Sequence, residues 1–185
     1  MLNDVYREIQ KRMNKTIEAT REEMAGIRTG RASPAILDHI SAEYYGSQLP
    51  INQLATISVP EPRLILIQPW DKSSLPAIDK AILKSSLGLN PSNDGNVIRL
   101  SIPALTEERR KELDKVVKRK AEDGRVALRN IRRDTNDLLK KMEDKKEITE
   151  DDLERARDKI QEITDEAISQ IDKLLAAKEK EILEF

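Results

Sequence analysis

The side chains that carry out covalent or metal chemistry are almost absent from this chain of 185 residues. It contains no cysteine, which excludes thiol nucleophiles, thiolate metal sites and disulfides. His39 is the only histidine, so Ser-His and Cys-His pairs and multi-histidine metal sites are excluded as well. No glycine-rich string of the kinds that cradle phosphate groups occurs. We therefore predict no catalytic residue, no metal site and no cofactor, and we interpret His39 as a surface residue of a strand.

Six carboxylates in the middle of the chain are the remaining candidates for acid–base chemistry. Their spacing does not bring any two of them into one pocket, so a hydrolase using them stays an alternative that the residues do not favour. The run Asn90–Gly95 is similar in composition to a calcium loop, but it lacks the acidic first ligand, and Ser101 stands where a glutamate is needed. We interpret this run as a tight turn. The six carboxylates are those of Asp38, Glu43, Glu61, Asp71, Asp79 and Asp94.

Charge is distributed unevenly along a chain whose net charge is only −1. Residues 109–141 contain 13 lysines and arginines against 6 acidic residues, whereas residues 142–185 contain 8 against 15. On a helix, at about 100° per residue, eight of these bases share one flank with only Asp114 and Glu122. This basic flank faces either the acidic last helix or an external polyanion, for which the planar fork of arginine is well suited. Its members are Lys111, Lys115, Lys118, Arg125, Arg129, Arg132, Arg133 and Lys140.

The positions of the prolines indicate which elements hold this flank. All eight lie between Pro34 and Pro103. Because proline breaks the interior of a helix, long helices are expected before and after a turn-rich segment. Apolar residues at helical spacing continue to Ile27 in the first arm, and Gly30 is expected to terminate that helix.

Two further helices follow the turn-rich segment. Thr106 is the expected N-cap of the first, whose apolar stripe runs in heptad-like steps to Leu138 and Met142. Thr149 and Asp152 have the spacing of a capping box at the start of the second. A short charged connection between them predicts an antiparallel pair, which makes a three-helix bundle with the first arm.

The segment between the arms has the composition of short strands. Four runs rich in Ile, Val or Tyr predict strands, and Ser73–Ser85 has the spacing of one short helix. The fold class is therefore α+β: a long three-helix bundle formed by residues 1–30 and 105–185, with an inserted small β/α/β domain at residues 31–104. The predicted strands are Leu37–Tyr45, Ala55–Val59, Arg63–Gln68 and Asn96–Ile102.

Several strings spread over the whole chain resemble the ribosome recycling factor family of bacteria. They stand in the same order, and we find no departure from the family pattern within them. The strings are Ile27–Pro34, Gly88–Pro91, Leu105–Lys111, Arg129–Asp134 and Lys178–Phe185.

The resemblance implies a fold, a function and a set of partners. It implies an L-shaped monomer of roughly tRNA-like dimensions that works in the cytoplasm without a membrane. It implies binding to the post-termination 70S ribosome, on 23S rRNA of the 50S subunit. Elongation factor G, in its GTP-bound form, would then act with the protein to split the subunits and release mRNA and tRNA. The chain itself would not be an enzyme.

The resemblance also carries site residues over to this sequence. The arginines expected to contact ribosomal RNA are Arg28, Arg31, Arg110, Arg129, Arg132 and Arg133. Two chain crossings join the bundle and the insert, and we predict that they form a hinge. Gly30 can absorb dihedral changes, whereas Pro103 makes the return crossing stiffer. The hinge residues are Gly30, Ala32, Ser33, Pro103, Ala104 and Leu105.

One alternative from another class remains open at this point. The chain could be a structural coiled-coil adaptor whose basic flank only pairs with the acidic last helix. Removal of the arginines would then lower stability and leave RNA binding unaffected. The contacts of each basic side chain distinguish this reading from an RNA-binding one.

Overall fold

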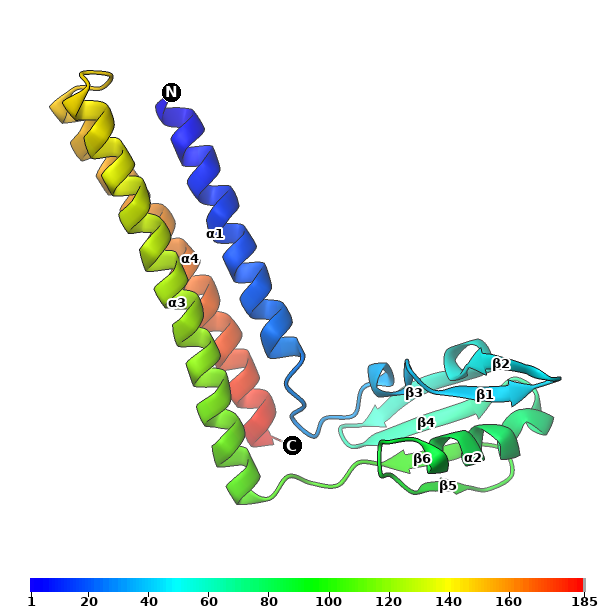
Figure 1. Ribbon diagram of the computed structural model, residues 1–185. Coiled ribbons are helices and arrows are strands. Elements are labelled where there is room, and N and C mark those ends of the chain that lie inside the picture. The colour runs from blue at the N-terminus through cyan, green and yellow to red at the C-terminus, as the bar shows by residue number, and fades with distance from the viewer. Residues whose placement is uncertain (185) are drawn as a thin grey trace. The chain divides into compact units, whose positions relative to one another are not determined.

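The computed structural model describes residues 1–184 and divides them into two units. The first unit comprises Met1–Arg28 and Glu107–Glu184, and the second comprises Thr29–Thr106. The predicted α+β fold class, with a long three-helix bundle and an inserted β/α/β domain, is confirmed (Figure 1). Phe185, the last residue of the predicted bundle, lies outside the described residues, and the L shape stays a prediction.

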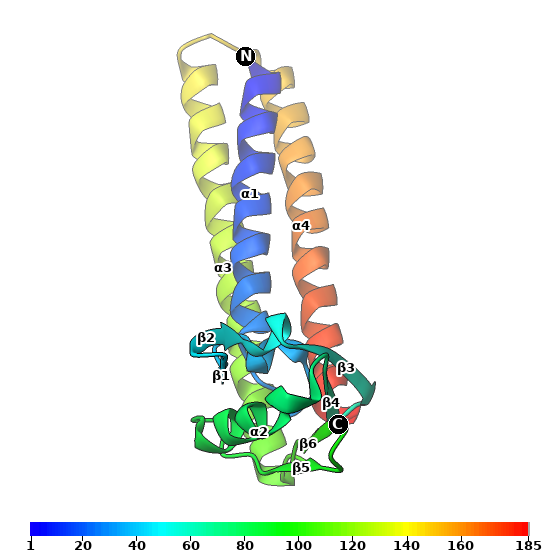
Figure 2. The ribbon, with the colours of Figure 1, turned by 90° about the vertical axis from the view of Figure 1, so that its right-hand side faces the viewer.

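The first unit is a bundle of three long helices, each packed on the other two (Figure 2). They are α1 (Leu2–Ala25), α3 (Glu107–Asp144) and α4 (Glu150–Glu184). α3 runs antiparallel to both of the others. Buried aliphatic side chains from all three helices, such as Met13, Leu128 and Ile160, form one continuous core. Burial of these apolar stripes is what holds such long charged helices together.

The apolar stripe of α3 differs from the predicted one near its end. Leu138 was expected in the core but is 47% exposed, whereas Leu139 is fully buried. The reason is geometric. Steps of four and three average 3.5 residues, whereas an α-helix has 3.6 residues per turn, so the buried face drifts. Two consecutive steps of four, from Ile131 to Thr135 and on to Leu139, correct the drift.

The end of α1 also differs from the prediction. The helix ends at Ala25, and Gly26 rather than Gly30 is its C-cap, with its N–H bonded to the carbonyl of Glu22. Apolar spacing up to Ile27 had extended the predicted helix beyond this point. Gly30 instead lies in the following loop at φ 79°, a left-handed conformation that favours glycine.

The start of α4 is built as predicted. The N–H of Asp152 donates to the hydroxyl of Thr149 at 3.1 Å, and the N–H of Thr149 donates to the Asp152 carboxylate at 3.2 Å. These two bonds form a capping box with Asp in place of Glu. The pKa of Asp152 lies below its ordinary value, chiefly because the Thr149 hydroxyl also donates to its carboxylate at 2.7 Å, and next because the Thr149 N–H does. Ile148 and Leu153 on either side are buried, as expected of a hydrophobic staple.

The second unit contains one α-helix, α2 (Leu75–Lys84), and two antiparallel sheets. β1 pairs with β2 in one sheet, and the order in the other is β3-β4-β6-β5. Apolar residues of both sheets and of α2 form a separate core without aromatic residues among its fully buried members. The strands are β1 (Ser41–Tyr44), β2 (Ser47–Pro50), β3 (Ala55–Glu61), β4 (Leu64–Pro69), β5 (Pro91–Asn93) and β6 (Ile98–Ser101).

Two strands of the second unit were not predicted. β2 and β5 are short, carry little apolar alternation and include prolines, which are more typical of turns than of strands. β5 is an edge strand that begins at Pro91. Proline has no N–H to donate to a neighbouring strand, and an edge strand tolerates this loss. The run Asn90–Gly95 is therefore an edge strand followed by a turn, not a turn alone.

Candidate nucleic-acid interface

All eight bases of the predicted basic flank lie on α3, but the structure divides them by the groups that they bind. Some pair with carboxylates of α4, some pair with carboxylates of α3, Arg132 binds a neutral amide, and others have no partner among residues 1–184. This division decides which of them can meet an external anion.

Arg125 and Lys118 bridge α3 to the acidic α4. The Nε and Nη2 of Arg125 donate to Oδ1 of Asp172 at 2.8 and 2.6 Å. Lys118 bonds Asp114 at 2.7 Å and lies 3.5 Å from Glu179 of α4. The pKa values of both bases are raised, chiefly by Asp172 for Arg125 and by Asp114 for Lys118. For these two residues the pairing of helices explains the charge.

Arg129 is held within its own helix. It donates through Nη2 to Glu122, which also accepts from Nη1 of Arg125 at 3.2 Å. The pKa of Glu122 is accordingly lowered, first by Arg129 and then by Arg125. Arg129 remains 42% exposed. Its guanidinium is ordered by this pair and still reaches solvent.

Arg132 has a neutral partner on α4. Its Nη1 donates to Oε1 of Gln161 at 3.0 Å. Arg133, the next residue, is exposed and makes no hydrogen bond or ion pair with any residue in 1–184. These two positive charges are therefore not neutralised by a directly bonded carboxylate of the bundle.

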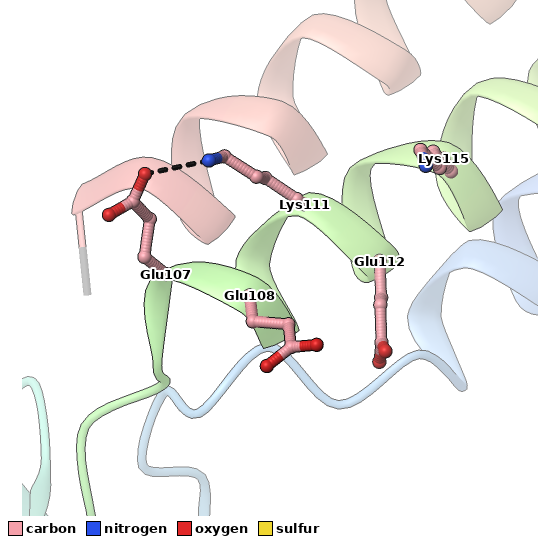
Figure 3. Close-up of a pocket in the computed structure, with 5 residues that line it drawn as sticks. All are labelled: Glu107, Glu108, Lys111, Glu112 and Lys115. Carbon is pink, nitrogen blue, oxygen red and sulfur yellow. Dashed lines mark ion pairs between the residues drawn. The ribbon is translucent and has the colours of Figure 1, made fainter.

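The start of α3 has mixed charge (Figure 3). A shallow hollow there is lined by residues of this one helix: Glu107, Glu108, Lys111, Glu112 and Lys115. Lys111 lies 2.8 Å from Glu107 in an ion pair. Arg110, on the same turn, is half-buried, and its Nε is buried without a hydrogen-bond partner among the described residues. Beyond this end, in the middle of α3, Arg132 and Arg133 are the predicted arginines that no carboxylate of residues 1–184 pairs with, whereas Arg129 is paired with Glu122.

The two remaining predicted RNA contacts lie in the loop after α1. Arg28 and Arg31 are both exposed, on either side of Thr29 and Gly30. Arg28 ends the first unit, and Arg31 belongs to the second. The structure thus gives these six arginines three kinds of setting: a loop, the first turn of α3 and the middle of α3.

The predicted hinge residues differ in how firmly they are held by the second unit. The N–H of Ala32 donates to the carbonyl of Pro62 at 2.7 Å, and the N–H of Ile102 donates to that of Arg63 at 2.8 Å. Ser33 accepts from the N–H of Ala35 and caps a short 3₁₀ turn. Both crossings are thus attached to the turn between β3 and β4. Ala32 and Ser33 belong to the folded insert.

The other four hinge residues lie outside these attachments. A Cβ built on Gly30 would lie 3.0 Å from Cγ of Leu105, so the two crossing segments touch at this point. Pro103 and Ala104 are exposed, and Leu105 is half-buried. The part of each crossing that these backbone bonds leave unattached is therefore short.

Two carboxylates of the insert, those of Asp71 and Asp94, bind backbone N–H groups of its turns. Oδ1 of Asp71 accepts from the N–H of Ser73, and its Oδ2 accepts from the hydroxyl of Tyr44. Oδ1 of Asp94 accepts from the N–H groups of Asn96 and Val97, each at 2.9 Å. The pKa of each carboxyl is lowered, chiefly by Ser73 for Asp71 and by Val97 for Asp94. Both are therefore ionised at neutral pH and cannot serve as general acids.

Residues 1–184 contain no group of three or more His, Asp or Glu side chains arranged to hold a metal ion. Among them, no helix is both long and apolar enough to cross a bilayer. His39 is exposed beside β1, in the turn that precedes it.

Sequence reasoning missed the partners of the arginines. Glu122 lies three residues before Arg125 and seven before Arg129, so helical spacing could have identified it. Gln161 lies 29 residues from Arg132 on another helix, and no local signal points to it.

Comparison with known proteins identifies relatives of the whole chain. The family model for ribosome recycling factor matches residues 20–183. The ribosome-recycling factor of Desulfitobacterium hafniense is 61% identical over 184 residues and covers 100% of both chains. That of Carboxydothermus hydrogenoformans is 58% identical over 183 residues and covers 99% of both.

Solved structures give the same result. A solution structure of the ribosome recycling factor has a TM-score of 0.71 at 47% identity and covers 100% of this chain and 98% of its own. The T. thermophilus ribosome recycling factor, placed with E. coli elongation factor G on the E. coli post-termination complex, has a TM-score of 0.63 at 50% identity. It covers 99% of each chain.

Proposed function

The chain belongs to the ribosome recycling factor family, and we propose that it binds the post-termination 70S ribosome and splits it. Elongation factor G with bound GTP is the partner in this step, and mRNA and tRNA are released for another round of translation. The protein acts in the cytoplasm as a monomer and uses no cofactor of its own. The nucleotide is hydrolysed by the elongation factor. The relative placed with elongation factor G on a post-termination complex supports this assignment.

The observation that carries the proposal is the exposed, unneutralised charge in the middle of α3. Arg132 bonds a neutral amide, and Arg133 has no partner within residues 1–184. Arginines that only stabilise a bundle would be expected to pair with the acidic α4, as Arg125 does with Asp172. The adaptor alternative therefore accounts for Arg125 and Lys118 but leaves Arg132 and Arg133 without a role.

We assign the RNA contacts to the six arginines expected from the family resemblance. Arg129, Arg132 and Arg133 contact phosphates of 23S rRNA from α3. Arg110 contributes from the first turn of that helix, and Arg28 and Arg31 contribute from the loop after α1. Such contacts are made to the RNA backbone. Binding to the 50S subunit should therefore weaken as salt is raised, because the release of counterions from the RNA contributes less free energy at higher salt.

Charge reversal tests this assignment. Arg129→Glu with Arg132→Glu should weaken binding to 50S subunits strongly and flatten its dependence on salt, because fewer counterions are released. The melting temperature should change little, since exposed pairs contribute only about 0–1 kcal/mol each. A matched control reverses Arg155 and Arg157, two exposed arginines of α4. It carries the same change in net charge and should bind nearly as the unchanged protein does.

Two results would contradict the RNA-binding role. One is a 50S affinity of the Arg129→Glu, Arg132→Glu variant within about twofold of that of the unchanged protein, together with a large fall in melting temperature. These arginines would then stabilise the bundle and not bind RNA. The other is an equal loss of affinity in the control variant, which would mean that only the overall charge matters.

We further propose that the insert swings relative to the bundle during splitting. Because Ala32 and Ile102 are bonded to the turn between β3 and β4, the rotation is confined to residues 28–31 and 103–106. Gly30 supplies the dihedral freedom, and Pro103 limits that of the return crossing. Ala32 and Ser33 then move with the insert and mark its edge, whereas Ala104 and Leu105 flex.

A further inference from the structure

Arg132 is bound differently from the other arginines of the basic flank. Arg125 bonds the carboxylate of Asp172, and Arg129 bonds that of Glu122. Arg132 instead donates to the amide oxygen of Gln161 at 3.0 Å. The partner comes from α4, which is otherwise rich in carboxylates.

The orientation of the Gln161 amide is set by a second bond. Its Nε2 donates to Oδ1 of Asp165, one turn further along α4, at 2.7 Å. If the amide were rotated by half a turn, its NH₂ group would face the guanidinium and its oxygen would face the carboxylate. Both contacts would then be repulsive. Asp165 therefore keeps the amide oxygen directed at Arg132.

A neutral acceptor in this position has a specific consequence for phosphate binding. A guanidinium carries five N–H donors, and one bond to an amide leaves the others free and the charge intact. A carboxylate in the same place would neutralise the charge and compete with a phosphate for it. Arg132 is also half-buried beside α4. An arginine held in this way loses less conformational entropy on binding than a free one.

We infer that Gln161 is a positioning residue for RNA binding, because its amide oxygen fixes the Arg132 guanidinium without neutralising it. The inference rests on the proposed function, in which Arg132 contacts an RNA phosphate. Gln161 itself touches no RNA in this scheme. It acts through Arg132, and Asp165 acts through Gln161.

Two substitutions at Gln161 separate the orientation of the Arg132 guanidinium from its charge. In Gln161→Ala the guanidinium keeps its charge but is no longer held, so 50S affinity should fall about threefold to tenfold at an unchanged salt slope. In Gln161→Glu a carboxylate pairs with Arg132, so affinity should fall by at least tenfold and the salt slope should decrease. Gln170→Glu, which adds the same charge at another exposed position of α4, is the control and should bind within about twofold of the unchanged protein. All variants should keep their melting temperatures, because the bond is exposed.

The same pair of substitutions in an Arg132→Ala background completes the test. There both Gln161 variants should bind 50S subunits within about twofold of the Arg132→Ala parent, because the guanidinium that Gln161 orients is gone. The inference is overturned if Arg132→Ala weakens binding while Gln161→Ala does not, or if the Gln161 effects persist in that background. If Arg132→Ala leaves 50S affinity unchanged, then the assignment of Arg132 to RNA fails, and the inference fails with it.

Discussion

Substitution of Gly124 tests how closely the three helices approach one another. A Cβ at this position would lie 2.7 Å from Oγ1 of Thr20 on α1 and 2.8 Å from Cδ1 of Ile171 on α4. The end of the Ile171 side chain is flexible and can move away. Thr20 is held more firmly, because it is buried and its hydroxyl donates to the carbonyl of Thr16 at 3.0 Å. The contact with Thr20 therefore determines the cost.

The magnitude follows from two opposing effects. Replacement of glycine by alanine inside a helix stabilises by up to about 1 kcal/mol, whereas overpacking of a close contact costs about 1–3 kcal/mol. Gly124→Ala should therefore lower the free energy of unfolding by about 1 kcal/mol. In a Thr20→Ala background the clashing hydroxyl is absent, and the same change should stabilise by up to about 1 kcal/mol. The expected coupling between the two sites is thus about 2 kcal/mol.

Urea unfolding followed by circular dichroism at the helical band measures this coupling. Trp70 is the only tryptophan and lies in the second unit, so its fluorescence reports the insert separately. The midpoint that it reports should not change in any of the variants. Effects of the two substitutions that add to within about 0.5 kcal/mol would refute the close approach of α1 and α3 at this level.

Three further predictions concern the cap of α4, the strut at Arg125 and the hinge. Thr149→Ala removes the capping hydroxyl and should lower the free energy of unfolding by about 1 kcal/mol. The pKa of Asp152 is lower in the folded state, so the ionised carboxylate stabilises the fold at neutral pH and this contribution is lost as pH falls through the folded pKa. The melting temperatures of Asp152→Asn and the unchanged protein should therefore converge below about pH 4. Arg125→Gln should lower the melting temperature while 50S affinity stays within about twofold, because this side chain pairs with Asp172; a large loss of affinity without a loss of stability would contradict its role as a strut. A disulfide between cysteines introduced on the insert and on the bundle should preserve 50S binding and abolish splitting with elongation factor G until it is reduced, and full splitting by verified cross-linked protein would show that no swing is needed.

The fold could be predicted where one physical signal dominates. The confinement of proline to the middle of the chain separated the helices from the insert, and the apolar spacing located the core of each helix. The capping box at Thr149 was found because its two residues are three apart and need no tertiary information. The errors lie where local signals conflict with packing. Leu138 was chosen over Leu139 because a strict repeat ignores helical drift, and β2 and β5 were missed because pairing with neighbouring strands outweighs their weak strand propensity.

The candidate interface could be predicted as a flank but not as a set of working residues. Helical angle alone placed Arg125 and Arg132 next to each other, since both face the same side of α3. Their partners, Asp172 and Gln161, lie 47 and 29 residues further along the chain. Only the packing of α4 against α3 decides that one arginine meets a carboxylate and the other an amide. This difference assigns a structural role to Arg125 and leaves Arg132 available to bind an external anion, which a count of charges on the flank could not do.

The most direct test of the central claim is the splitting of post-termination 70S ribosomes, followed by light scattering in the presence of elongation factor G and GTP. We predict that the unchanged protein converts 70S ribosomes into subunits, and that the variant with Arg129→Glu and Arg132→Glu does so at least tenfold more slowly at equal protein concentration. The control with Arg155 and Arg157 reversed should keep most of the activity. Absence of splitting by the unchanged protein, or equal rates for the Arg129 and Arg132 variant, would contradict the account.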